Sequence, residues 1–241
     1  MREHHPRQLL STAADPSVQL LRRAGLADGL PVSVLKKRLL WALVSPAFHG
    51  RQLGERLGAN LRADARTRVA FVLYLLALGG VAVSAGGLAF ALAFVLPLTL
   101  FYQQAQLLRI CVEHLRAGDD GTDRDRARMA ELTQAIFLGS PPPQGRSVGA
   151  WSSWAMKMLG HLSVRLVVLP GESGAAHDYH HFRPRGDWAN YMAARREHLA
   201  ECAALGQGHL YREVWGYSHA LALSLASISR LGGETIEGRV G

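Results

Sequence analysis

The hydrophobic pattern divides the chain into one long apolar segment with polar, Arg-rich regions on either side. Residues 69–101 contain no Asp, Glu, Lys or Arg over 33 consecutive positions. As one helix, this run would be about 50 Å long at roughly 1.5 Å per residue. A bilayer core is about 30 Å thick, so one straight span would overshoot it.

Small residues lie near the middle of this run and predict a break. Glycine pairs occupy positions 79–80 and 86–87, with Ser84 between them. We expect two membrane helices, about 67–82 and 88–108, joined by a tight turn. A single long helix kinked at Pro97 is the alternative.

Shorter segments predict further helices. A short helix is expected within 17–24. Residues 32–48 resemble a basic amphipathic helix lying on a membrane surface, the alternative being a soluble helix packed on a core. The remaining expected elements are a helix ending near Phe137, a linker at 139–145, an interfacial helix or third partial membrane element at 148–169, and helices at 187–204 and 209–231.

These elements predict an all-α, integral membrane fold with one transmembrane hairpin. The expected organisation is a cytoplasmic segment at 1–66, the hairpin at 67–108, and a cytoplasmic helical region at 109–241. The N-terminus lacks the apolar core of a signal peptide.

Charge supports this topology. The net charge is +8, and arginines flank the apolar run on both sides. By the positive-inside tendency, both ends of a hairpin would then be cytoplasmic. We find no helix-turn-helix, RNP or zinc-finger pattern, so nucleic acid is not an expected partner. The two cysteines, Cys111 and Cys202, suggest neither a disulfide framework nor a thiolate metal site.

The densest candidate chemistry is the H-x-x-H-H segment at 177–181. On a helix, His177, His180 and His181 occupy positions i, i+3 and i+4 and share one face. Imidazoles on one face can converge on metal ions such as iron, copper, nickel or zinc. A solvated, His-rich loop is the alternative.

Two other placements extend this set. His4 and His5 are adjacent near the N-terminus, and His114 follows Glu113 directly after the second expected membrane helix. If the hairpin forms, all of these histidines can reach one cytoplasmic surface.

In this order, the motifs resemble the membrane-bound fatty acid desaturase family, within the histidine-box desaturase and hydroxylase group. The matching segments are His4-His5 with Thr12–Pro16 (second box), the apolar hairpin, Arg109 with Glu113-His114, His177–His181 (third box), and the trailing segments 187–190 and 213–216. The first box and its hairpin have no counterpart here, and Met1 stands where the second box would begin with His. We therefore expect an N-terminally truncated chain, a genuinely shortened protein being the alternative.

The resemblance implies O2-dependent desaturation of fatty acyl chains at a bacterial inner membrane. It implies two iron ions held by His4, His5, His114, His177, His180 and His181, with no catalytic residue beyond these ligands. Electrons would come from a ferredoxin-like or cytochrome-type donor. Asp178, Asp187 and Glu113 are the expected acceptors for the rings' free N–H groups, although Asp187 could instead cap a helix starting at Trp188.

Rival functions remain open at this level. One is a histidine-box hydroxylase of a lipid or alkane, and another is a catalytically silent fragment of such an enzyme. A third is a membrane-anchored metal-binding protein without redox chemistry. We expect the remaining histidines to be packed or at the surface, His198 and His219 among the latter.

Overall fold

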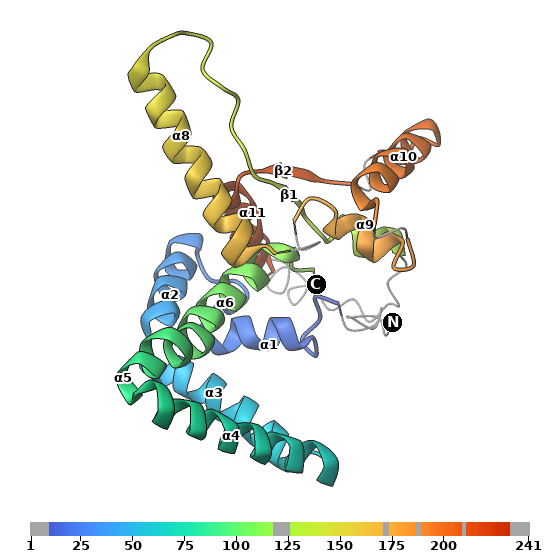
Figure 1. Cartoon of the computed structure of the whole chain (residues 1–241). Helices are drawn as coiled ribbons and strands as arrows, with labels where there is room; N and C mark the ends of the chain where they lie inside the picture. The colour runs from blue at the N-terminus through green and yellow to red at the C-terminus, as the bar shows by residue number, and fades with distance from the viewer. Residues whose placement is uncertain (1–9, 118–125, 171–173, 187–188, 209–210, 232–241) are drawn as a thin grey trace. The chain divides into compact units, whose positions relative to one another are not determined.

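Helices form most of the chain in the computed structural model (Figure 1). The structure describes residues 10–117, 126–170, 174–186, 189–208 and 211–231. The chain divides into two compact units, one formed by Met1–Leu39 and Leu108–Gly241, the other by Leu40–Leu107. Each unit is described by itself below.

The predicted helix at 32–48 ends earlier than expected. The structure contains α2 at Val32–Val44 and a separate α3 at Pro46–Arg62. Proline has no backbone N–H and restricts the residue before it, so Pro46 favours the first turn of a new helix. The Ser45 hydroxyl caps α3 by accepting a hydrogen bond from the Phe48 N–H at 3.3 Å.

The apolar run forms two helical segments that meet at Gly86. The first is α4 at Ala65–Ala85, and Gly86 has a φ of +84°, which favours glycine. The second extends from Gly87 to Glu113 without interruption. The predicted break is therefore confirmed, and a single long helix is excluded. At 21 and 27 residues, both segments are longer than predicted.

The second segment changes its hydrogen-bonding pattern along its length. It comprises α5 (Gly87–Phe90), the π-helices η1 (Ala91–Val95) and η2 (Pro97–Phe101), and α6 (Tyr102–Glu113). Pro97 cannot donate a backbone hydrogen bond; η1 ends two residues before it and η2 begins at it. The proline therefore falls at a local widening of the helix.

Both segments are long and apolar enough to cross a bilayer, at about 31 and 40 Å with 1.5 Å per residue. Over the most apolar 18 residues of each segment, only 0% and 6% are buried, whereas the last turns of the second segment, such as Leu107 and Val112, are buried. Ala65–Ala85 and Gly87–Glu113 are the two segments of this kind in the part of the chain that the structure describes.

A two-stranded parallel sheet departs from the all-α prediction. Strand β1 (Ala135–Phe137) pairs with β2 (Glu213–Trp215), and Ile136 lies opposite Val214. The helix predicted to end near Phe137 is present as α7 (Arg126–Glu131), but its predicted end is wrong, since residues 135–137 form β1. The predicted helix over 209–231 also starts late, because α11 covers Tyr217–Arg230. Three-residue strands show no local periodicity, and their pairing partners are distant in sequence.

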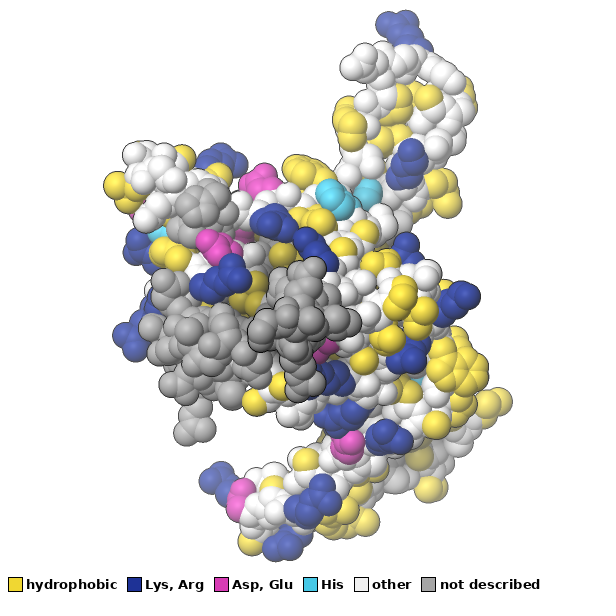
Figure 2. Space-filling model, turned by 180° about the vertical axis from the view of Figure 1, so that it is seen from behind, with side chains coloured by type: hydrophobic (Ala, Val, Ile, Leu, Met, Phe, Trp, Pro, Cys, Tyr) yellow, Lys and Arg dark blue, Asp and Glu magenta, His cyan; other side chains and the backbone are white. Residues whose placement is uncertain are grey.

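The remaining elements of this unit are helical. They are α1 (Pro16–Arg23), α8 (Val148–Ser163) continued by the π-helix η3 (Val164–Val168), α9 (His177–Phe182) and α10 (Tyr191–Ala204). Helix α10 starts later than the predicted residue 187. Large apolar side chains remain exposed along α8 and η3, such as Met156 and Leu166 at 67% and 68% (Figure 2).

The start of α1 is fixed to the residues after His114. The Asp15 carboxylate caps α1 through Ser17 N–H at 2.8 Å and also accepts from Ser11 N–H at 2.8 Å. The Ser11 hydroxyl donates to the Leu115 carbonyl at 2.9 Å. Residues 11–15 therefore lie beside the end of α6.

Arg116 strengthens this attachment. Its guanidinium donates to the Ser11 carbonyl and pairs with Asp28 at 3.2 Å. Burial opposes ionisation of Asp28, but hydrogen bonds from Arg22 and Arg116 hold its pKa below the usual range. The ion pair thus joins the loop after α1 to the residue two positions after His114.

Candidate metal centre

Three buried histidines converge in the first unit. The ligand nitrogens of His114, His177 and His181 all lie within 4.8 Å of one another. The Nε2 atoms of His114 and His177 are 3.4 Å apart. Two imidazole nitrogens bound to one ion at about 2.1 Å would be separated by roughly 3.0–3.4 Å. The Nε2 atoms of His114 and His177 therefore have the spacing of two ligands of one ion, and His181 lies close enough to complete a candidate three-histidine group.

Helix geometry explains why His177 and His181 belong to this group. They are four residues apart on α9, so their side chains lie on one face. Their ring centroids are 4.9 Å apart, and each lies about 5 Å from the His114 ring. The predicted helical reading of H-x-x-H-H is confirmed, and the alternative of a solvated loop is wrong because all three motif histidines are buried.

A hydroxyl beside Nδ1 indicates the tautomer of His114. The Thr133 hydroxyl donates to the Met129 carbonyl at 2.7 Å, so its oxygen is free to accept from His114 Nδ1–H at 3.3 Å. That leaves the lone pair of His114 Nε2 directed toward His177. When a histidine binds a metal through one ring nitrogen, the other ring nitrogen typically donates to another protein group. The sequence pattern gave no indication of this role for Thr133.

His180 lies beside the three histidines without joining them. Its ring centroid is 5.4 Å from that of His181 and 6.2 Å from that of His177, and its side chain is buried. The predicted ligands His4 and His5 lie outside the described residues, as does Asp187. The structure therefore brings together three of the six predicted ligands and places a fourth next to them.

The predicted role of Asp178 as a ring acceptor is wrong. Its carboxylate makes a two-point ion pair with Arg195 of α10, through Nε to Oδ1 at 2.9 Å and Nη2 to Oδ2 at 2.8 Å. The same guanidinium donates through Nη1 to Glu213 of β2 at 2.9 Å. Glu113, also predicted as a ring acceptor, lies 3.4 Å from Arg109 in an i,i+4 pair.

Burial and ion pairing shift the pKa values of Asp178 and Arg195 in opposite directions. Burial raises the pKa of Asp178, and the hydrogen bonds from Arg195 oppose that shift. Burial alone would lower the pKa of the Arg195 guanidinium, but its two carboxylate partners raise it above the ordinary value. Arg195 therefore stays charged, as arginine does in proteins generally.

His198 lies in a second buried cluster rather than at the predicted surface. Its Nδ1 contacts the Tyr211 hydroxyl, and the Cys202 Sγ is 3.8 Å from Nε2. Tyr179, within the histidine motif, packs on the other side with its ring centroid 6.0 Å from that of His198. Burial is the main cause of a lowered pKa at His198, assisted by the positive charge of Arg183.

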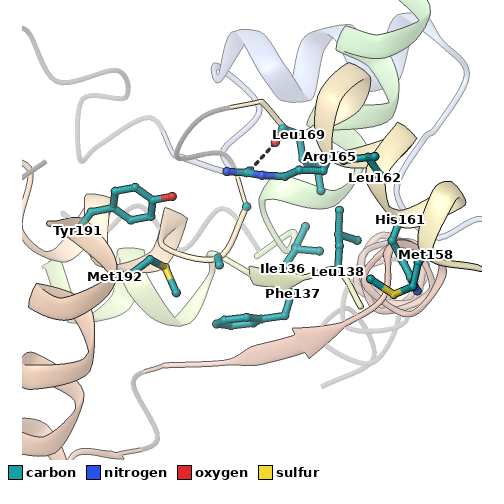
Figure 3. Close-up of a pocket in the computed structure, with 12 residues that line it drawn as sticks. Ile136, Phe137, Leu138, Met158, His161, Leu162, Arg165, Leu169, Tyr191 and Met192 are labelled. Atoms are coloured by element: carbon teal, nitrogen blue, oxygen red, sulfur yellow. Dashed lines mark hydrogen bonds between the residues drawn. The ribbon is translucent and has the colours of Figure 1, made fainter. Parts of the chain in front are cut away.

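A pocket of about 380 Å³ lies in the same unit (Figure 3). Its lining is mostly apolar, with one guanidinium, that of Arg165, which donates to the Leu169 carbonyl at 2.6 Å. Ala175, two residues before His177, belongs to its wall. The lining residues are Ile136, Phe137, Leu138, Met158, His161, Leu162, Arg165, Leu169, Gly174, Ala175, Tyr191 and Met192.

Three features thus occur in one compact unit: a buried histidine cluster, an ion network that holds the histidine helix, and an apolar pocket. Comparison of the chain with family models, with curated proteins and with solved structures finds no match.

Proposed function

We propose that this chain carries the metal centre of an O2-dependent, iron-using membrane enzyme that oxidises lipid acyl chains, most simply a desaturase. The observation that carries the proposal is the convergence of His114, His177 and His181 on one point. Neutral imidazoles bind iron without adding negative charge, and three of them leave positions open for other ligands.

The donor set fits one ion directly. His114, His177 and His181 would hold it, and His180 lies next to them as a ligand for a second ion. The proposal includes His4 and His5 as further ligands. Residues 11–15 are fixed beside Leu115, and five residues of extended chain span at most about 18 Å, so the sequence allows the pair to reach the cluster.

An iron pair would supply the oxidising power that an unactivated C–H bond requires. In the overall reaction, the acyl chain loses two hydrogens with their electrons, and two further electrons and two protons complete the reduction of O2 to two waters. A ferredoxin-like or cytochrome-type protein would provide those two electrons. The buried rings, with that of His114 held by Thr133, provide a preorganised site, and the apolar pocket suits a hydrocarbon segment.

Metal binding provides the first test. The purified chain in detergent is loaded with Fe²⁺ under anaerobic conditions, and bound iron is measured per chain. We expect His177→Ala and His181→Ala to lower iron affinity by about 100-fold or more, because each removes a metal ligand. Substituting a residue that only hydrogen-bonds a ligand typically lowers metal affinity by about 10- to 100-fold. His219→Ala is the matched control, because His219 is exposed on α11. Equal binding by all variants would refute the site.

Product analysis separates the rival functions. With reductant, an electron donor and acyl lipid, a desaturase yields chains with two hydrogens fewer, whereas a hydroxylase yields chains with one added oxygen. If the loaded chain binds iron but gives no O2-dependent product, a membrane-anchored metal-binding protein is the better description.

A further inference from the structure

A buried ion network passes through the middle of the histidine motif. Asp178 is fully buried, directly follows His177, and forms a two-point pair with Arg195, whose side chain is only 4% exposed. Arg195 also binds Glu213. One guanidinium therefore connects α9, α10 and β2.

Two aromatic rings hold the guanidinium in place. Its central carbon is 5.5 Å from the centre of the Phe137 ring and 5.4 Å from that of Tyr211. Phe137 is also part of the pocket wall. Arg195 thus contacts the side chain that lines the pocket and the helix that carries the histidines.

The histidine helix is too short to fix its own orientation. Helix α9 has only six residues, and short helices gain little stability from their own hydrogen bonds. Successive side chains on a helix are about 100° apart. Holding the Asp178 side chain on one side therefore determines where His177 and His181 point. Asp178 Oδ1 also accepts from Tyr179 N–H at 2.7 Å, which limits its rotation.

We propose that Arg195 is a positioning residue that sets the rotation of the histidine helix, so that His177 and His181 meet His114 at the metal. This inference rests on the proposed metal site. It assigns no contact between Arg195 and the metal, since the guanidinium acts through Asp178.

Co²⁺ is a suitable probe, because its visible absorption reports ligand number and geometry. The full chain in detergent is titrated with Co²⁺, and the thermal midpoint is measured on the same samples. For Arg195→Gln we expect a 10- to 100-fold weaker affinity and an altered spectrum. Arg196→Gln is the matched control, since Arg196 is adjacent and exposed, and it should retain both properties.

Conservative variants keep the test decisive if Arg195→Gln does not fold. Arg195→Lys retains the charge but cannot reproduce the planar, two-point pairing, so an altered spectrum is expected despite the retained charge. Glu213→Gln removes the negative charge from one of the three hydrogen-bond acceptors of Arg195, which weakens that contact and should shift affinity less, in the same direction. Folded Arg195→Lys and Glu213→Gln proteins with wild-type affinity and spectrum would overturn the assignment.

Failure of the metal site itself would look different. A wild-type chain that shows no Co²⁺ spectrum refutes the metal centre, and the role of Arg195 with it. If the wild-type chain shows the Co²⁺ spectrum and a folded Arg195→Gln variant shows the same spectrum, only the role of Arg195 is refuted. A variant that loses thermal stability but keeps the spectrum shows that Arg195 is merely structural.

Discussion

At the residue scale, single polar contacts decide which imidazoles can serve the centre. His114 has its Nδ1 held by Thr133, which leaves Nε2 facing His177. His198 also has its Nδ1 held by a hydroxyl, that of Tyr211, but the atom 3.8 Å from its Nε2 is the Cys202 Sγ rather than another imidazole nitrogen. The two buried histidines therefore differ in what lies beside Nε2, and not in their burial.

His198 predicts a pH dependence of stability. Its pKa is lowered in the folded chain, so the unfolded chain binds more protons as the pH falls through about 6.5, the ordinary histidine value. Stability is therefore full above that pH and declines below it. We expect His198→Asn to be less stable at neutral pH but to show a shallower decline of the thermal midpoint between pH 7 and pH 5.

His219→Asn is the control for this measurement, because His219 is exposed. The metal-free protein must be used, since metal binding would add its own pH dependence. An unchanged slope in His198→Asn would show that another group controls acid stability.

At the element scale, the sequence predicted elements whose causes are local. The apolar run with Gly86 and the i,i+4 spacing of His177 and His181 are signals within one segment, and the structure confirms both elements. It did not predict β1 and β2, because three-residue strands acquire their identity from a distant partner. Nor did it predict the pairing of Arg195 with Asp178, since Asp178 was expected to accept from a histidine ring and no local pattern links the two residues.

Gly86 provides a test at this scale. With φ at +84° and ψ at 132°, its backbone lies in a region that residues with a Cβ rarely adopt. We expect Gly86→Ala to destabilise the full chain by about 1–3 kcal/mol in detergent-micelle unfolding. Gly87→Ala is the control, because a Cβ there meets open space at a helical position. It should be neutral or slightly stabilising, and equal destabilisation by both would contradict the turn.

At the scale of the whole molecule, two apolar segments are long enough to cross a membrane, and their most apolar parts are almost uncovered by the described residues. Segments Ala65–Ala85 and Gly87–Glu113 each match or exceed a bilayer core in length. Arginines lie outside both ends, for example Arg62 and Arg116. The proposed arrangement therefore places both flanks on one side of a membrane and the turn at Gly86 on the other.

Cysteine labelling tests this topology. Cys111 and Cys202 are 2% and 3% exposed, so the unmodified chain should react little with a membrane-impermeant thiol reagent. We expect Ser84→Cys to be labelled when the reagent is added to spheroplasts. We expect Arg62→Cys to be labelled only in inverted membrane vesicles. Both positions are exposed. Labelling of both from the same side would exclude a two-pass arrangement.

The parallel pairing of β1 with β2 also bears on how the proposed centre would acquire a metal ion. Helices α8, α9 and α10 all lie between the two strands in sequence, so the ladder cannot close until Glu213–Trp215 has left the ribosome. His181 is synthesised roughly 2 to 6 s earlier, at about 5–20 residues per second. During that interval the Glu213 bond to Arg195 does not exist, and the proposed ligands would be open to any cation present. Copper and zinc bind such nitrogens more tightly than ferrous iron does. Correct loading would then depend on the supply of iron during translation, or on exchange after the strands have joined.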